Sequence, residues 1–292
     1  MNMTELPLIT IGVSTYNRKD LLRLSLESLL AQTYPNCEII VVDDGSSDDT
    51  ETMVRKEFPS VTYIMQENAG DAAAKNHAAR LAKGEYIVFN DSDDLFLPTA
   101  VTDLYEQIKD HPGACAYGSY ITIDKDGNRM PTKSKVSTLP SGMITESLIR
   151  HVLVNSCGTL IPTALYRQLG GYDISLRHGH DWKLSLELSL IAPFYPAPSP
   201  VFLRRRHNSN VSAASYRGSA NMLEVFEEFV AAHPGAYGKA ISRRRADLHN
   251  KLAREAKKEK MSGAVIREHL RCAMRNDFSL KTFCRYLATL CK

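Results

Sequence analysis

Short apolar runs alternate with amphipathic segments over the first 90 residues of this 292-residue chain, and this alternation constrains the fold more than any other feature. Runs rich in β-branched and aromatic residues are typical of buried strands, and apolar residues every three or four positions are typical of helices. The predicted strands are residues 8–14, 37–43, 61–65 and 86–90, and the predicted helices, with their caps, are residues 19–32, 46–57 and 70–82. Strands joined by such helices form right-handed crossovers, so we expect an α/β fold with a mostly parallel central sheet flanked by helices.

The pattern loosens after residue 111 and then becomes helical. Residues 115–123 indicate one strand, and residues 131–142 indicate a polar loop that closes over the active face. Further predicted elements are strands at 158–161 and 201–205 and helices at 163–169 and 181–191. From Gly218 onward the periodicity is helical throughout. We therefore expect a catalytic α/β domain over residues 1–215 and a basic helical extension over residues 216–292.

Composition narrows the class of protein. Hydrophobic residues make up 43% and charged residues 24% of the chain, as in ordinary globular proteins. No apolar run approaches the roughly 20 residues of a membrane-spanning helix, and residues 1–6 lack the pattern of a signal peptide, so a cytoplasmic location is expected. The six cysteines are scattered without a C-x-x-C pair, which favours reduced thiols.

Three carboxylates follow the apolar run at residues 86–90, in the segment Asp91-Ser92-Asp93-Asp94. Carboxylates this close repel one another unless a cation or strong donors lie between them. Because one small residue separates Asp91 from Asp93, both can face a hard divalent ion, which prefers oxygen ligands and bridges to phosphates. A solvated acidic turn that caps the helix near Pro98 is the alternative.

Two further polar clusters follow predicted strands, namely Ser14-Thr15-Tyr16-Asn17 and Asp43-Asp44-Gly45-Ser46. In a parallel α/β sheet, ligands bind beyond the carboxyl ends of the strands, so we expect both clusters to converge with Asp91 on one crevice. Tyr16 offers a ring to stack on a base, and an Asp accepts hydrogen bonds from a base or from ribose hydroxyls. For the second cluster, a turn that leads into a helix cap is the alternative.

With these motifs the chain resembles the family 2 glycosyltransferases of bacterial polysaccharide type, which have the GT-A (nucleotide-diphospho-sugar transferase) fold. The resemblance covers about residues 8–212, and its motifs stand in the family's order and spacing. Besides the three clusters, the matching segments are Asn68-Ala69-Gly70, Ala74-Lys75-Asn76, Gly84-Glu85-Tyr86-Ile87, Gly170-Gly171-Tyr172-Asp173, His180-Asp181-Trp182 and Arg204-Arg205-Arg206-His207.

The resemblance implies a role for each matching residue. Asp181 stands at the position of the family's catalytic base. A metal that bridges the donor diphosphate is implied at Asp91, Asp93 and His207. The residues implied to hold the nucleotide part of the donor are Ser14, Thr15, Tyr16, Asn17, Asp43, Asp44, Lys75, Asp91 and Ser92.

Two positions depart from the family's pattern. Lys75 replaces an arginine, which keeps the charge but loses the planar fork, so a phosphate contact is expected without bidentate geometry. His180 replaces the glutamate that precedes the base, which leaves Asp181 as the only carboxylate of that pair.

The implied activity is transfer of a sugar, with inversion at the anomeric carbon, from a nucleotide-diphosphate-sugar to a hydroxyl of a glycan or lipid-linked glycan. A UDP- or GDP-sugar donor, a Mn²⁺ or Mg²⁺ ion and a place in surface polysaccharide or glycoconjugate synthesis are expected. The alternative is a non-catalytic relative that binds a nucleotide-sugar and acts as a scaffold. A phosphatase is disfavoured because Leu95 stands where its motif has Thr, and a dehydrogenase because Gly12-Val13-Ser14-Thr15 is no G-x-G-x-x-G.

The C-terminal part is basic, with 15 Lys and Arg against 5 Asp and Glu over residues 239–292, although the whole chain carries only +3. Such asymmetry predicts an anionic partner, and we expect peripheral attachment to anionic lipid at the inner face of the membrane rather than nucleic acid. An ordinary charged helical face is the alternative, and a homo-oligomer is left open. The cations expected to face lipid are Arg243, Arg244, Arg245, Arg254, Lys257, Lys258 and Lys260. The apolar stripe expected to pack on the catalytic domain or on a partner is Leu280, Phe283, Leu287 and Leu290.

Overall fold

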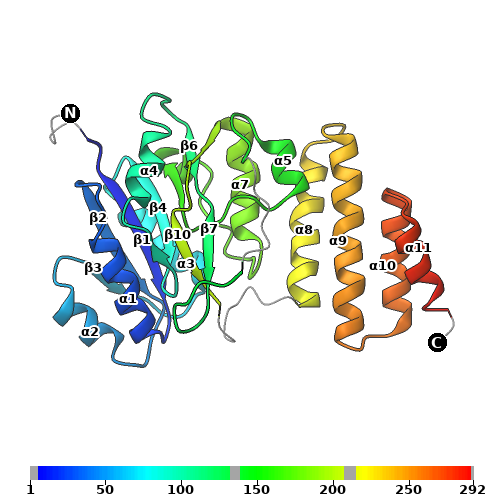
Figure 1. Cartoon of the computed structure of the whole chain (residues 1–292), viewed down its shortest axis with the longest axis horizontal. Coiled ribbons are helices and arrows are strands. Elements are labelled where there is room, and N and C mark those ends of the chain that lie inside the picture. The colour runs from blue at the N-terminus through cyan, green and yellow to red at the C-terminus, as the bar shows by residue number, and fades with distance from the viewer. Residues whose placement is uncertain (1–5, 132–138, 207–214, 291–292) are drawn as a thin grey trace. The chain divides into compact units, whose positions relative to one another are not determined.

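The structure, a computed structural model, describes residues 6–131, 139–206 and 215–290 (Figure 1). Most of the loop predicted at residues 131–142 therefore lies outside the described residues. The chain divides into two compact units. The first comprises Met1–Ile144, Val154–Ser175 and Glu187–Asn208, and the second comprises Thr145–Leu153, Leu176–Leu186 and Ser209–Lys292.

A seven-stranded sheet with the order β3-β2-β1-β4-β8-β6-β9 forms the centre of the first unit. Its first four strands are mutually parallel, β8 is antiparallel to β4 and β6, and β9 is parallel to β6. The predicted α/β fold with a mostly parallel sheet is confirmed. The strands are β1 (Ile9–Thr15), β2 (Cys37–Asp43), β3 (Thr62–Met65), β4 (Tyr86–Asp91), β6 (Cys115–Tyr117), β8 (Thr159–Pro162) and β9 (Phe194–Pro196).

The central strands are apolar throughout because helices cover both faces of the sheet. Leu22 of α1 belongs to the same buried apolar cluster as Ile11 of β1. On the opposite face Gly12 makes room for α3, since a Cβ at Gly12 would lie 3.2 Å from the Cβ of Ala78. The helices of this unit are α1 (Lys19–Leu30), α2 (Thr50–Glu57), α3 (Asp71–Leu81), α4 (Ala100–Glu106) and α6 (Thr163–Gln168).

A second, three-stranded sheet shows that the single strand predicted over residues 115–123 is wrong. This segment forms β6 in the large sheet and β7 in the small one. The chain changes sheet at Gly118, whose N–H donates to the carbonyl of Gly158 at 2.9 Å. A Cβ at Gly118 would lie 2.3 Å from Cγ2 of Val201, so the packing there leaves no room for a side chain. The strands of the small sheet, in order, are β5 (Leu95–Phe96), β10 (Phe202–Arg205) and β7 (Tyr120–Ile123).

Helices make up the second unit, which confirms the helical pattern predicted for the C-terminal part. Within it α9 packs against α5, α8 and α10, and α10 packs against α11. Among the residues that the structure describes, no helix is long and apolar enough to cross a membrane. The helices are α5 (Thr145–Arg150), the first part of α7 (His180–Ile191), α8 (Tyr216–Ala232), α9 (Gly238–Lys258), α10 (Gly263–Asn276) and α11 (Leu280–Leu287).

Replacing Gly118 by Ala tests the packing at the change of sheet. The added methyl group would overlap the side chain of Val201, so we expect the free energy of unfolding to fall by about 1–3 kcal/mol, the usual cost of overpacking. Urea denaturation followed by circular dichroism measures this loss. Gly238→Ala is the control, because a Cβ at Gly238 meets no atom within 4 Å. Equal stability of the two variants would contradict the packing described here.

Candidate active site

Hydrogen bonds join the loops that follow β1 and β2. The N–H of Asn17 donates to Oγ of Ser46 at 2.8 Å, and the N–H of Ser47 donates to Oδ1 of Asn17 at 2.8 Å. Asn17 has a φ of 50°, a left-handed conformation that Asn tolerates better than most residues. Ser14 of β1 lies in register with Asp91 of β4, so the third polar cluster begins at the same edge of the sheet. The structure thus brings together the three clusters that the sequence singles out.

Asp43 and Asp44 are buried, and the chain already supplies donors to both carboxylates. Asp43 accepts hydrogen bonds from the N–H of Ser46 and from the hydroxyl of Tyr63, each at 2.7 Å. Asp44 accepts from the side-chain amide of Gln66 at 2.8 Å and from the backbone N–H groups of residues 69 and 70 at 2.9 and 2.8 Å. The two carboxylates therefore fix the loops that follow β2 and β3.

Two side chains at the end of β1, Thr15 and Tyr16, present groups that a ligand can use. Tyr16 is 49% exposed, so its ring is accessible for stacking. The hydroxyl of Thr15 is buried and has no hydrogen-bond partner among the described residues, which is a costly state for a hydroxyl. Ser14, in contrast, is hydrogen-bonded to the carboxylate of Asp71 at the start of α3.

A buried lysine connects α3 to the end of β4. Lys75 is 1% exposed, and its Nζ donates to Asp71 at 2.9 Å and to Asp91 at 2.6 Å. A third hydrogen bond runs to Oγ of Ser156 at 3.2 Å. Burial lowers the pKa of Lys75, but the attraction of the two carboxylates outweighs it, so the pKa lies well above its ordinary value. The three donors of the ammonium group are thus directed at partners within the chain.

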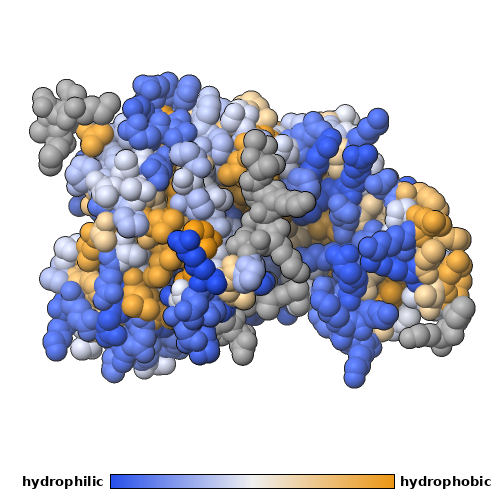
Figure 2. All heavy atoms as spheres, in the orientation of Figure 1, coloured by the Kyte–Doolittle hydropathy of each residue, from blue (hydrophilic) through white to orange (hydrophobic). Residues whose placement is uncertain are grey.

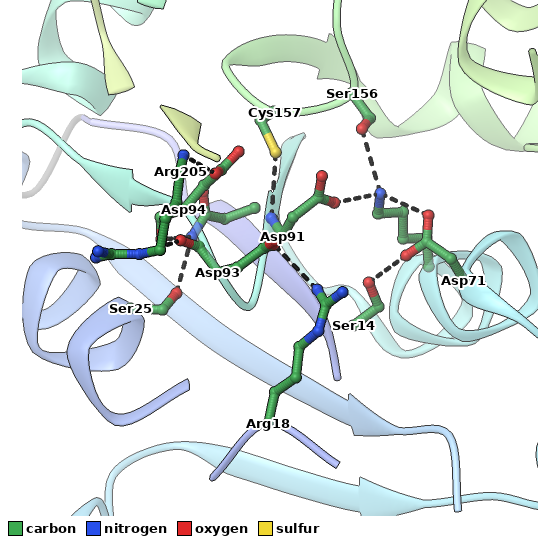
Figure 3. Close-up of polar contacts among 12 residues, drawn as sticks. Ser14, Arg18, Ser25, Asp71, Asp91, Asp93, Asp94, Ser156, Cys157 and Arg205 are labelled. Carbon is green, nitrogen blue, oxygen red and sulfur yellow. Dashed lines mark hydrogen bonds and ion pairs between the residues drawn. The ribbon is translucent and has the colours of Figure 1, made fainter. Parts of the chain in front are cut away.

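The turn after β4 holds three carboxylates that contact different partners (Figure 3). While Asp91 faces Lys75, Oδ1 of Asp93 lies 3.1 Å from Nη1 of Arg18. Asp94 accepts a hydrogen bond from the N–H of residue 205 at 2.9 Å. Burial, reinforced by the charges of Asp91 and Asp93, raises the pKa of Asp94 well above its ordinary value. The turn therefore places three carboxyl groups close together, one of which is buried and has a raised pKa.

The residues at this turn fit a hard divalent cation. Ligand atoms of Asp91, Asp94 and Cys157 lie within 4.8 Å of one another. The two carboxylates are the ligands that Mn²⁺ and Mg²⁺ prefer, and a divalent charge would offset the repulsion among them. The sequence also predicts Asp93 as a metal ligand. In the structure its carboxylate pairs with Arg18, in the loop between β1 and α1. His207, the third predicted ligand, lies outside the described residues.

Asp181, the predicted catalytic base, belongs to the second unit, in the first turn of α7. It is partly buried, and its Oδ1 accepts a hydrogen bond from the N–H of Trp182 at 2.9 Å. Its carbonyl accepts from Oγ of Ser185 at 2.7 Å. A carboxylate in a first helical turn also meets the helix dipole favourably, so a structural role and a chemical role are compatible.

Trp182, next to the predicted base, is fully buried between side chains of the C-terminal helices. Phe226 of α8 stacks on it with ring centroids 6.1 Å apart and planes at 6°, and the guanidinium of Arg244 lies 4.8 Å from its ring. Its Nε1 donates to the carbonyl of Leu148 in α5 at 2.9 Å. Burial lowers the pKa of Arg244, and the electron-rich ring face offsets part of the cost of burying that cation. Helices α5, α8 and α9 therefore hold the residue that follows Asp181.

Several residues of the site escaped the sequence analysis. Asp94 and Arg205 stand in the matched motifs but received no role, and Arg244 was expected to face lipid, whereas it is partly buried and its guanidinium lies over the ring of Trp182. Ser92, expected to contact the donor, is 2% exposed. The other residues of the network carry no local signal because their partners are distant in sequence: Arg18, Asp71, Ser156 and Cys157.

Residues 10–171, more than half of the chain, match the family described as Glycosyl transferase family 2. The chain belongs to this glycosyltransferase family. As a family 2 glycosyltransferase it is 27% identical over 289 residues to an uncharacterized glycosyltransferase of Rickettsia typhi, a match that covers 96% of this chain and 89% of the relative. It is 29% identical over 214 residues to the chondroitin synthase of Escherichia coli, across 72% of this chain and 30% of that enzyme.

Solved structures show the same GT-A fold for this family 2 glycosyltransferase. S. aureus TarS 1-349 in complex with UDP-GlcNAc has a TM-score of 0.72 at 16% identity, over 97% of this chain and 89% of that one. The mannosyltransferase PcManGT from Pyrobaculum calidifontis, in complex with GDP-Man and Mn²⁺, has a TM-score of 0.67 at 21% identity, over 99% of this chain and 81% of that one. The resemblance in family and in fold is thereby confirmed.

Replacing Lys75 by Met tests whether its charge holds the site together. The change leaves Asp71 and Asp91 without their buried cation, so we expect the free energy of unfolding to fall by about 2–4 kcal/mol, less than for a fully buried pair because both carboxylates are partly exposed. Urea denaturation is the measurement. Lys83→Met, which removes an exposed lysine, should stay within about 0.5 kcal/mol of the wild type. A loss no larger than that of the control would exclude Lys75 as the centre of the network.

Proposed function

We propose that this glycosyltransferase moves a sugar from a nucleotide-diphosphate-sugar to a hydroxyl acceptor with inversion at the anomeric carbon. The observation that carries the proposal is the convergence of three polar loops at one edge of the sheet, one of which is the carboxylate turn at residues 91–94. The carboxyl edge of a parallel sheet is where nucleotides bind in open α/β folds. Nucleotide-sugars bound to TarS and PcManGT support a UDP- or GDP-sugar as donor.

The loops after β1 and β2 form the nucleotide side of the proposed site. The exposed ring of Tyr16 stacks on the base, and the unsatisfied hydroxyl of Thr15 finds its hydrogen-bond partner in the donor. Asp43 and Asp44 act by fixing the loops that line this side, because both carboxylates are buried and hydrogen-bonded. Asn17 joins the two loops, so it acts in the same way.

Lys75 serves the donor indirectly in this proposal. The phosphate contact expected from the sequence is replaced by an orienting role, since its ammonium group is directed at three acceptors of the chain. It holds the Asp91 carboxylate at the end of β4 and, through Asp71, the hydroxyl of Ser14. The donor therefore meets side chains that are already fixed, which limits the entropy lost on binding.

Asp91 and Asp94, with Asp93 beside them, would hold a Mn²⁺ or Mg²⁺ ion. When bound, such an ion supplies positive charge that stabilises the departing nucleoside diphosphate. The Mn²⁺ in the complex of PcManGT supports this part of the proposal. Arg18, which pairs with Asp93, brings a further cation to the same turn.

Asp181 acts as the base in the proposed reaction. It takes the proton of the acceptor hydroxyl as the oxygen attacks the anomeric carbon, while the nucleoside diphosphate leaves from the opposite face. The hydrogen bond from the N–H of Trp182 and the packing of that indole restrict the carboxylate to one orientation. His180 precedes Asp181, so no second carboxylate stands beside the base in sequence.

The proposed acceptor is a glycan or a lipid-linked glycan, and the proposed pathway is synthesis of a surface polysaccharide or glycoconjugate. Similarity to the chondroitin synthase of E. coli supports a polysaccharide product, although the match spans less than a third of that enzyme. A panel of nucleotide-sugars screened by thermal shift would identify the donor, because a bound donor raises Tm by mass action. Release of nucleoside diphosphate by pure protein then separates a transferase from a binding scaffold.

Metal dependence gives the first test of the proposed chemistry. We expect turnover to need Mn²⁺ or Mg²⁺, and Asp93→Ala to lower kcat by roughly 10²-fold or more because the leaving diphosphate then loses stabilising charge. Rates are measured with and without EDTA and after metal is restored. Asp110→Ala, at an exposed carboxylate, should leave kcat unchanged. Full turnover in EDTA would rule out metal assistance.

The second test concerns the base. Asp181→Asn keeps an oxygen for the N–H of Trp182 but accepts no proton, so kcat should fall by roughly 10²-fold or more while the Kd of the donor stays the same. Calorimetric titration with the donor measures Kd, and a coupled assay of nucleoside diphosphate measures kcat. Asp110→Asn is the matched control. Wild-type turnover by the Asp181 variant would assign proton transfer to another residue.

A further inference from the structure

Helix α11 buries a polar residue and exposes apolar ones, which is the reverse of the usual arrangement. Thr282 is 2% exposed, whereas Leu280 is 70% and Leu287 is 43% exposed. A surface helix normally buries its apolar stripe and exposes its polar residues. The stripe expected to pack on the catalytic domain or a partner is therefore uncovered in this chain.

Polar contacts fix this orientation of α11. Oγ1 of Thr282 donates to Oδ1 of Asn250 in α9 at 3.1 Å, which turns the polar side of α11 inward. On the neighbouring helix, Arg271 donates to the hydroxyl of Tyr286 at 3.0 Å, with its guanidinium 5.4 Å from the centre of that ring. A further hydrogen bond from Arg267 to the carbonyl of residue 289, at 3.1 Å, holds the end of the helix. The apolar residues on the opposite side consequently face outward.

The uncovered residues form a continuous apolar face, which we name the α11 face. In Figure 2 a group of apolar side chains lies over the part of the second unit that α10 and α11 occupy in Figure 1. The rings of Phe278 and Phe283 lie 6.1 Å apart, so the two aromatic side chains contribute to one patch. The α11 face consists of Phe278, Leu280, Phe283, Leu287 and Leu290, each between 37% and 70% exposed.

Cations border the α11 face. Residues 263–290 carry five Lys and Arg against two Asp and Glu, and Arg275 and Lys281 among them are exposed. The cations of α9 that were expected to meet lipid are less suited. Arg244 is partly buried and lies on an indole ring, and Arg245 forms an ion pair with Glu227 at 2.6 Å. Apolar side chains with cations beside them therefore coincide at α10 and α11.

We propose that the α11 face binds the surface of a membrane that contains anionic lipid, with its Leu and Phe side chains among the acyl chains and its cations at the headgroups. Amphipathic helices lie in the interface in this way. A second copy of the chain fits less well, because across a two-fold axis the same patch would meet itself and bring the cations that border one copy toward those of the other. The proposal concerns attachment alone and does not depend on the donor or on the base.

Flotation of the full chain with vesicles tests the proposal. The vesicles are phosphatidylcholine with roughly a third phosphatidylglycerol, or phosphatidylcholine alone. We expect binding to the anionic vesicles at low salt and loss of most of it at high salt, because exposed charges are screened. The double variant Leu280→Ser with Leu287→Ser should lower the partition coefficient by roughly tenfold or more. Its circular dichroism spectrum should match the wild type, because both side chains are exposed.

Two charge variants distinguish membrane binding through the α11 face from general electrostatic attraction between a basic protein and anionic lipid. Arg275→Gln with Lys281→Gln removes two cations beside the face and should lower the partition coefficient by about fivefold for each cation. Arg243→Gln with Arg254→Gln removes the same charge from exposed positions of α9 and should lower it by less than about threefold.

Four outcomes would overturn the proposal. The wild type floats with neither vesicle at low salt, the Leu280→Ser and Leu287→Ser variant binds like the wild type, or the two charge variants lose binding equally. The fourth is a dimer, seen by sedimentation velocity without vesicles and lost in the Leu280→Ser and Leu287→Ser variant, which would assign the α11 face to a second copy of the chain.

Discussion

The repulsion among carboxylates at the end of β4 is the constraint around which the edge of the sheet with the proposed site is built. Lys75 offsets it from inside the protein by pairing with Asp71 and Asp91, and Arg18 offsets it from the α1 loop by pairing with Asp93. These pairs tie β4 to α3 and to the loop after β1. Burial, reinforced by the charges of Asp91 and Asp93, still raises the pKa of Asp94. A cation bound at this turn, as proposed, would offset the remaining repulsion, so the same constraint bears on the fold and on the proposed chemistry.

The sequence predicted β1 to β4 and their helices because apolar periodicity is a local property. It failed at Gly118, where the change of sheet depends on Val201, far along the chain. In the site, the convergence of the loops followed from strand order, since parallel strands end at one edge. The partner of each charged side chain did not follow, because pairing depends on rotamers and packing. Lys75 shows this most clearly, as its charge suggested a phosphate contact and its burial gives it carboxylates instead.

In the C-terminal helices, too, the sequence pattern predicts the elements but not how their side chains pack. Periodicity revealed that α11 has an apolar stripe, but the side turned toward its neighbours depends on the contact between Thr282 and Asn250. A count of cations likewise overstated the charge that α9 offers to a partner, since Arg244 and Arg245 have partners within the unit. Net charge is thus a poor guide to an available surface until the intramolecular pairs are known.

The packing of Trp182, next to the proposed base, constrains how this chain can evolve. Trp182 packs against both Phe226 of α8 and Arg244 of α9, so residues on three separate helices must be compatible with one another. Recombination that replaces the C-terminal helices would succeed only if the new helices placed both an aromatic ring and a cation against the indole of Trp182. Descendants of this chain should therefore inherit the C-terminal helices and the segment around Asp181 as one block, even though much of the catalytic sheet's sequence lies outside that block.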